Sequence, residues 1–192
     1  MKKIFMTLAA AVIAVSANAQ IWAGGELGFT SEHLNGVGTE TVVTVRPEVG
    51  YSINEDFDIA VSLGFSHSSD KLNKNLAGNT KFFANTFEVN PYVRYKFFKA
   101  GNFFAFVDGG VGYAATHYSA RMNGDKFSKN ENMVGVSIVP GLAYSISNKV
   151  TLVSHLGEGL YYNHQWMKDY YHANNFGCRL FNGITFGAYY NF

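Results

Sequence analysis

The sequence predicts an all-β protein: an eight-stranded antiparallel up-and-down β-barrel that spans a membrane. Three observations predict it: a fourfold repeat, side chains that alternate in character along each repeat, and a high content of aromatic residues. The chain has 17 Phe and 12 Tyr among 192 residues and a net charge of only +1. Low charge with many aromatic residues suits strands whose outer face meets lipid. The small charge, without a basic run, argues against nucleic acid as a partner.

The first residues have the parts of a secretory signal peptide. Two lysines precede an apolar run over residues 4–15, after which Ala17 and Ala19 lie two residues apart. The run is too short for a spanning anchor helix. We therefore expect residues 1–19 to be a cleaved signal peptide and residues 20–192 to form the barrel domain. The rest of the sequence has no apolar stretch of helical membrane-spanning length, so it can cross a bilayer only as a closed barrel.

Four similar segments recur along the chain. Three begin with proline, at Pro47, Pro91 and Pro140, and share the pattern P-x-[VL]-x-Y-x-[IF], and residues 186–192 fit the same frame with Phe first. The segments start 44, 49 and 46 residues apart. A regular period of this length indicates a repeated supersecondary unit. Each unit holds two alternating segments, so the unit is a hairpin.

Four hairpins give eight strands. We expect them at about residues 20–30, 39–53, 57–68, 81–98, 103–118, 132–147, 150–162 and 175–192. Connections after the even-numbered strands are minimal. Those after the odd-numbered strands are longer and polar, at residues 31–38, 69–80, 119–131 and 163–174. Short turns on one side and long loops on the other are typical of bacterial outer-membrane barrels, with both chain ends on the periplasmic side.

The character of the side chains alternates with a period of two. In the third strand Ile59, Val61 and Leu63 share one face, and Ala60 and Ser62 share the other. Bulky apolar residues outside and small or polar residues inside are the arrangement of a barrel in lipid. A soluble lipocalin-like barrel or sandwich also alternates with this period and is the alternative.

Aromatic residues form two groups that match the interfacial girdles of a spanning barrel. The group near the short turns is Tyr51, Phe57, Tyr95, Phe97, Phe103, Tyr144, Tyr190 and Phe192. The group toward the loops is Phe29, Phe65, Phe83, Tyr113, Tyr118, Tyr161 and Phe176.

The seventh strand breaks the alternation. Leu152 and Leu156 share the outer face, and the same register would place Glu158 toward lipid, which is costly. A bulge near Gly157 or Gly159 would turn this carboxylate away from the bilayer.

The whole mature chain resembles the small outer-membrane barrel family that includes OmpX and the OmpA transmembrane domain. The resemblance rests on the strand count, the loop asymmetry, the repeated strand ends and the terminal Phe192. It implies recognition by the barrel-assembly machinery, because a last strand ending in an aromatic residue is similar to the signal which that machinery reads. The resemblance predicts the architecture and says almost nothing about activity.

The alternation points charges of both signs into the lumen. The inward set is Glu26, Arg46, Glu48, Glu88, Arg94, Asp108 and Arg179. An eight-stranded barrel is just wide enough for its own side chains, and buried charges persist only when paired. We therefore interpret the set as a polar core. A narrow passive channel is the alternative.

Two further patterns could carry chemistry. Loop histidines could hold a metal, but their spacing matches no ligand motif, so no metal and no cofactor are expected; they are His33, His67, His117, His164 and His172. His117-Tyr118-Ser119 resembles the H-x-S motif of outer-membrane lipid A deacylases, in which a histidine activates a serine nucleophile. The sequence offers no obvious acidic third member.

These observations favour a non-enzymatic outer-membrane barrel that contributes to envelope integrity or contacts external partners through its four long loops. A passive porin-like channel and a lipid A-modifying hydrolase with His117 and Ser119 as catalytic residues are the alternatives. Expected partners are outer-membrane lipid and lipopolysaccharide, the assembly machinery and an extracellular ligand at the loops. We expect a monomer.

Overall fold

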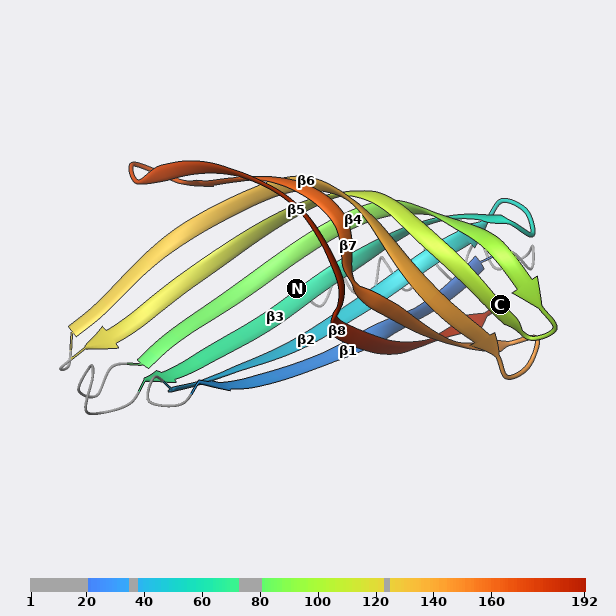
Figure 1. The fold of residues 1–192 in the computed structure, drawn as a ribbon, viewed down its shortest axis with the longest axis horizontal. Helices are drawn as coiled ribbons and strands as arrows, with labels where there is room; N and C mark the ends of the chain where they lie inside the picture. The colour runs from blue at the N-terminus through green and yellow to red at the C-terminus, as the bar shows by residue number, and fades with distance from the viewer. Residues whose placement is uncertain (1–20, 35–37, 73–80, 123–124) are drawn as a thin grey trace, which may run out of the picture.

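Eight antiparallel strands close into one barrel in sequence order (Figure 1). The computed structural model describes residues 21–34, 38–72, 81–122 and 125–192. The strands are β1 (Ile21–Leu34), β2 (Gly38–Ser52), β3 (Phe57–Leu72), β4 (Lys81–Ala100), β5 (Phe103–Met122), β6 (Asp125–Ser145), β7 (Val150–Met167) and β8 (Tyr171–Asn191). The predicted all-β barrel and its strand order are confirmed.

The described chain contains no helix of the length and apolarity needed to cross a bilayer. The predicted signal peptide and its cleavage after Ala19 lie outside the described residues.

Tight turns join the hairpins at the end where the chain termini meet. Residues 53–56, 101–102 and 146–149 separate the strands there. In the first turn the Asn54 side-chain oxygen accepts hydrogen bonds from the backbone N–H groups of Asp56 and Phe57, both at 2.9 Å. The last residue, Phe192, donates its backbone N–H to the carbonyl of Ile21 at 2.9 Å, which ties the two ends of the barrel wall together.

Two of the predicted loops are wrong, because the strands continue through them. β5 and β6 pair as far as Met122 and Asp125, inside the loop predicted over 119–131. β7 and β8 pair as far as Met167 and Tyr171, inside the loop predicted over 163–174. A hydrogen-bonded ladder in water needs no alternation of apolar and polar side chains, so the sequence there carried no strand signal.

The side chains face the way that a membrane barrel requires. Val45 and Ile59 are each 46% exposed and Ile138 is 51% exposed on the outer wall, whereas Arg94 is 1% and Glu26 2% exposed inside. In water this would leave the apolar side outermost; in lipid it is the stable orientation. The soluble-barrel alternative is therefore wrong.

A double irregularity in β7 resolves the problem of Glu158. The β7–β8 register shifts on both sides of Gly157, and both Gly157 (φ 97°) and Gly159 (φ 68°) have left-handed backbone conformations. Glycine adopts this conformation without the steric cost that a Cβ would bring. Glu158 consequently lines the inner cavity, as the predicted bulge requires. The same shift moves Tyr161 into the cavity wall, so its prediction as a residue of the outer aromatic belt is wrong.

The seam between the first and last strands is closed only near the short turns. β1 pairs with β2 over its whole length, Ile21–Leu34, but with β8 only from Trp22 to Leu27. Beyond the Leu27–Phe186 pair, the β7–β8 hairpin diverges from β1 and stays paired with β6 as far as Trp166 (Figure 1).

Candidate functional site

The lumen near the short turns is filled by a buried arginine. Arg94 on β4 donates from Nε and Nη2 to the two carboxylate oxygens of Asp108 on β5, at 2.8 and 2.7 Å. The two residues face each other in the β4–β5 ladder, which fixes this two-pronged geometry. Nη2 also donates to the hydroxyl of Tyr189 at 3.1 Å.

Aromatic rings enclose the guanidinium. Its carbon lies 3.9 Å from the ring centroid of Phe106 and between 5.2 and 5.5 Å from those of Trp22, Tyr92 and Tyr189. A cation over aromatic faces is worth about 2 kcal/mol per good contact when water is excluded. Glycines make room for the rings, because a Cβ at Gly141 would overlap Phe106. This aromatic cage occupies the lumen at the level of Arg94.

His155 on β7 links two carboxylates above the cage. Its Nδ1 lies 2.6 Å from an oxygen of Glu26 and its Nε2 lies 2.8 Å from an oxygen of Asp108. An ionised carboxylate only accepts hydrogen bonds, so with both acids ionised the ring must donate from both nitrogens and carries a positive charge. The ring also meets Phe106 edge-on at 5.3 Å.

Glu48 on β2 is held by two phenols. The hydroxyls of Tyr92 and Tyr189 donate to the same Glu48 oxygen, at 2.7 and 2.9 Å. Both rings belong to the cage around Arg94, so the acid and the cation share their neighbours. Burial without these donors would leave a carboxylate unsatisfied, which is strongly unfavourable.

Arg46 bridges the upper acids. It lies 3.6 Å from Glu26 and 3.5 Å from Glu88. The side chains of Arg46 and Glu88 are 29% and 30% exposed, so the network becomes wetter toward the loops.

The structure brings together six of the seven residues in the inward set and leaves one apart. Arg179 is also directed toward the cavity, but it pairs with Glu158 at 3.3 Å, and both side chains are more than half exposed. The bulge in β7 and the irregular pairing opposite it in β8 separate Arg179 from the buried network.

Sequence reasoning missed five polar or charged residues of the packed lumen. His155, Tyr92 and Tyr189 all occupy inward positions, and Lys96 pairs with Asp58 at 2.8 Å below the cage. The signal was present, because their positions have the inward parity of their strands; the predicted set counted only acids and arginines, and it left out Asp58 among the acids.

Above the network the lumen is hollow. A cavity of about 720 Å³ reaches from Asp108 and Tyr92 upward to Asn163 and Gln165, and residues of all eight strands line it. The cavity floor is the buried network itself. Glu48, Asp108 and His155 of the network line its deep end.

His117 and Ser119 have no acidic partner in the described contacts. The His117 Nδ1 contacts the side-chain oxygen of Asn130 at 2.7 Å. An amide can orient an imidazole, but it does not stabilise the imidazolium that forms during acyl transfer as a carboxylate does. Within the described side chains, no three His, Cys, Asp or Glu residues are placed to share a metal ion.

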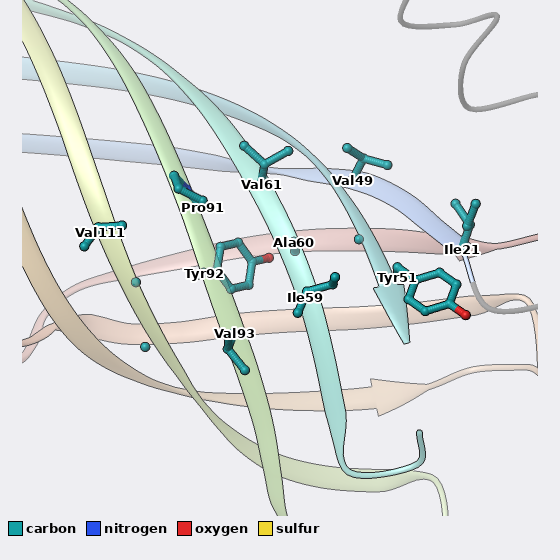
Figure 2. Close-up of a pocket in the computed structure, with 13 residues that line it drawn as sticks. Ile21, Val49, Tyr51, Ile59, Ala60, Val61, Pro91, Tyr92, Val93 and Val111 are labelled. Atoms are coloured by element: carbon teal, nitrogen blue, oxygen red, sulfur yellow. The ribbon is translucent and has the colours of Figure 1, made fainter. Parts of the chain in front are cut away.

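A shallow apolar hollow crosses the outer wall of β2 to β5. Figure 2 shows Ile59, Val61, Pro91, Val93 and Val111 around it. It exists because Gly109 has no side chain, and a Cβ there would meet nothing within 4 Å. The lining is suited to acyl chains and offers no reactive group.

The apolar, aromatic-rich outer wall and the buried polar network in the lumen define an integral outer-membrane β-barrel protein. The chain belongs to the outer membrane protein beta-barrel domain family, whose model matches residues 4–192. The resemblance noted from the sequence and the outer-membrane location are thereby confirmed. A search of curated protein sequences finds no match.

Several solved structures have a similar fold. A major outer membrane protein from Thermus thermophilus matches with a TM-score of 0.53 and 14% identity over 90% of this chain and 98% of that one. The translocator domain of the autotransporter NalP from Neisseria meningitidis matches with a TM-score of 0.51 and 13% sequence identity. The match covers 100% of this chain and 95% of that one. Neisserial surface protein A matches with a TM-score of 0.46 and 16% sequence identity over 90% of this chain and 95% of that one. At these identities the first two likenesses show the fold alone.

Proposed function

We propose that this barrel is a non-enzymatic, non-conducting surface protein that contacts external partners through its β5–β6 and β7–β8 hairpins. A spanning strand needs about 9–11 residues. β6 and β8 have 21 residues each, so both hairpins extend well beyond the bilayer. We also propose a contribution to envelope integrity. The filled lumen supports this role, because a barrel with a filled lumen adds no leak to the membrane.

The observation that carries the proposal is a set of contacts between the two hairpins. Lys129 Nζ lies 4.0 Å from the ring centroid of Tyr170, and the Tyr171 hydroxyl donates to Glu131. We call Phe127, Lys129, Glu131, Tyr170 and Tyr171 the hairpin platform. Tyr170 is 64% and Phe127 60% exposed. Exposed aromatic side chains on a fixed scaffold are frequent anchors of protein contacts.

Attachment assays test the platform directly. Cells that lack the chain would be complemented with the native protein or with Phe127→Ser/Tyr170→Ser, and attachment to polystyrene and cell–cell aggregation would be measured. We expect the double variant to lose both, because it removes apolar contact area without touching the barrel. Phe176→Ser, which changes an equally exposed aromatic residue outside the platform, serves as the control. Equal attachment by the native protein and the double variant would refute the platform.

Planar-bilayer recording separates this proposal from the channel alternative. Pure protein should show no large steady conductance, because the cavity ends at the Arg94 cage. A large steady conductance would overturn the non-conducting assignment.

Mass spectra of lipid A test the hydrolase alternative. Cells that express the native chain and cells that express His117→Ala should have identical lipid A. An acyl chain that is missing only when His117 is present would make the protein an enzyme.

A further inference from the structure

The unpaired part of the β1–β8 seam opens at the outer face of the membrane. Counting about ten spanning residues from Ile21 places Gly28 to Ser31 at the outer interface. In the described chain the last β1–β8 pair is Leu27–Phe186, just inside that level. At the base of the opening the two strands still approach, since a Cβ on Gly28 would lie 3.7 Å from Thr185 Cγ2.

Both flanks of the opening are unusually exposed and apolar. Leu27 and Phe29 on β1 are 66% and 71% exposed, and Phe181 and Phe186 on β8 are 68% and 67% exposed. Outward residues on continuously paired strands, such as Val45 at 46% and Val111 at 53%, are less exposed. Leu27 and Phe186 form the last β1–β8 pair, and Phe29 and Phe181 lie beyond it, so all four border the opening. These flanks present apolar surface to acyl chains at the level where the wall opens.

The inner cavity reaches this opening. Gly28 to Thr30 on β1 and Ile184 with Thr185 on β8 line it, and these are the segments that face each other across the opening. The same cavity is lined deeper in by the polar network. A molecule in the opening would therefore touch apolar surface outside and polar surface inside.

We propose that the β1–β8 opening is a binding site for a single-chain amphiphile of the outer leaflet with an uncharged, hydroxyl-rich head group. The acyl chain lies against Leu27, Phe29 and Phe186, and the head group enters the cavity past Gly28 and Thr30. This site is separate from the hairpin platform, whose β8 residue, Tyr171, lies at the opposite end of that strand, above the bilayer.

The cavity wall determines the class of head group. Its cations are already matched, Arg46 with Glu26 and Glu88, and Arg179 with Glu158. An anionic head would meet these acids and a cationic head would meet the arginines. The rest of the wall includes amides and hydroxyls, which exchange hydrogen bonds with sugar or glycerol hydroxyls. They are Thr44, Ser66, Asn90, Asn163, Gln165 and Asn175.

Photo-crosslinking tests the site. The mature protein in phosphatidylcholine nanodiscs would be labelled with dodecyl maltoside that carries a diazirine in its chain, and the adducts would be mapped by mass spectrometry. We expect adducts concentrated on Leu27, Phe29 and Phe186. Adducts spread evenly over the outer wall, including Val45, Ile59 and Ile138, would overturn the proposal.

A pair of glycine variants isolates the opening. Gly28→Leu fills its throat, whereas Gly112→Leu adds the same side chain on the closed β5 wall of the same cavity; both Cβ positions have ordinary clearance of 3.5 Å or more. Gly28→Leu should reduce labelling about tenfold, or ~1.4 kcal/mol, and Gly112→Leu much less. Thr30→Trp, at the rim, should act as Gly28→Leu does. Equal labelling of the native protein and both variants at the opening would refute the site.

The preference for a head group is tested with two further probes, which have the same diazirine-bearing dodecyl chain and a phosphocholine or a sulfate head group. Labelling should be strongest with maltoside, weaker with phosphocholine and weakest with sulfate. Equal labelling by all three, or strongest labelling by the sulfate, would contradict an uncharged ligand. Because attachment through the platform is measured separately on cells, loss of one activity leaves the other measurable.

Discussion

Below the Leu27–Phe186 pair the barrel is closed on every side and its lumen is packed with charged and aromatic groups, whereas above that pair the lumen is a cavity and the wall is open along one seam. The two regions use the same strands. In the lower region Arg94 and Asp108 are buried and share several partners, whereas in the upper region Arg179 and Glu158 are both more than half exposed. We therefore expect stability to be concentrated in the lower region.

Among the variants considered, removal of Arg94 should cause the largest loss of stability. Arg94→Met leaves Asp108 without its two-pronged partner and takes a cation from the cage. Breaking a buried ion pair in this way costs about 3–5 kcal/mol. Urea unfolding of the protein in phosphatidylcholine vesicles, followed by Trp fluorescence, measures the loss. Arg94→Lys keeps the positive charge but lacks the planar guanidinium. Its unfolding midpoint should therefore lie between those of the native protein and Arg94→Met. An unchanged midpoint for Arg94→Met would show that the lower network does not stabilise the barrel.

A glycine pair tests packing on the two sides of the wall. Gly141→Leu forces a side chain against Phe106 in the filled lumen, and overpacking of this kind costs about 1–3 kcal/mol. Gly109→Leu adds the same side chain on the lipid side, over the hollow of Figure 2, where nothing lies within 4 Å of the Cβ. We expect no loss from Gly109→Leu in the same unfolding assay. If both variants unfold alike, the lumen is not tightly packed at Phe106.

The β7 bulge should have a smaller effect. Gly159→Ala places a Cβ in a left-handed conformation, at a cost of about 1–2 kcal/mol, and directs it at the carbonyl oxygen of Ile138. Gly112→Ala, with ordinary clearance, is the control. Protease digestion near Glu158 should become faster only in Gly159→Ala. Equal digestion of both variants would mean that the bulge tolerates a side chain.

The sequence predicted the lower region better than the upper one, for a physical reason. Where one face meets lipid and the other a packed lumen, Val45 and Arg46 must differ in character, and that difference can be read from the chain. Where both faces meet water, as along residues 119–131, no such constraint acts, and the continuing strands went unrecognised. The inward position of His155 could be read from the sequence, but its link between Glu26 and Asp108 arises only when the closed barrel brings the three strands together. The unpaired seam is a tertiary feature with no local pattern.

Arg179 should mark the lower limit of these effects. It carries the same charge as Arg94 and also pairs with a carboxylate, Glu158, at 3.3 Å, but both side chains are more than half exposed. An exposed pair is worth about 0–1 kcal/mol, because water solvates each partner when the other is lost. Arg179→Met should therefore leave the urea midpoint nearly unchanged, and added salt should weaken what little effect remains. If Arg179→Met instead cost as much as Arg94→Met, burial would not be what distinguishes the two arginines, and the upper cavity would be part of the stabilising core and not a site kept open for a ligand.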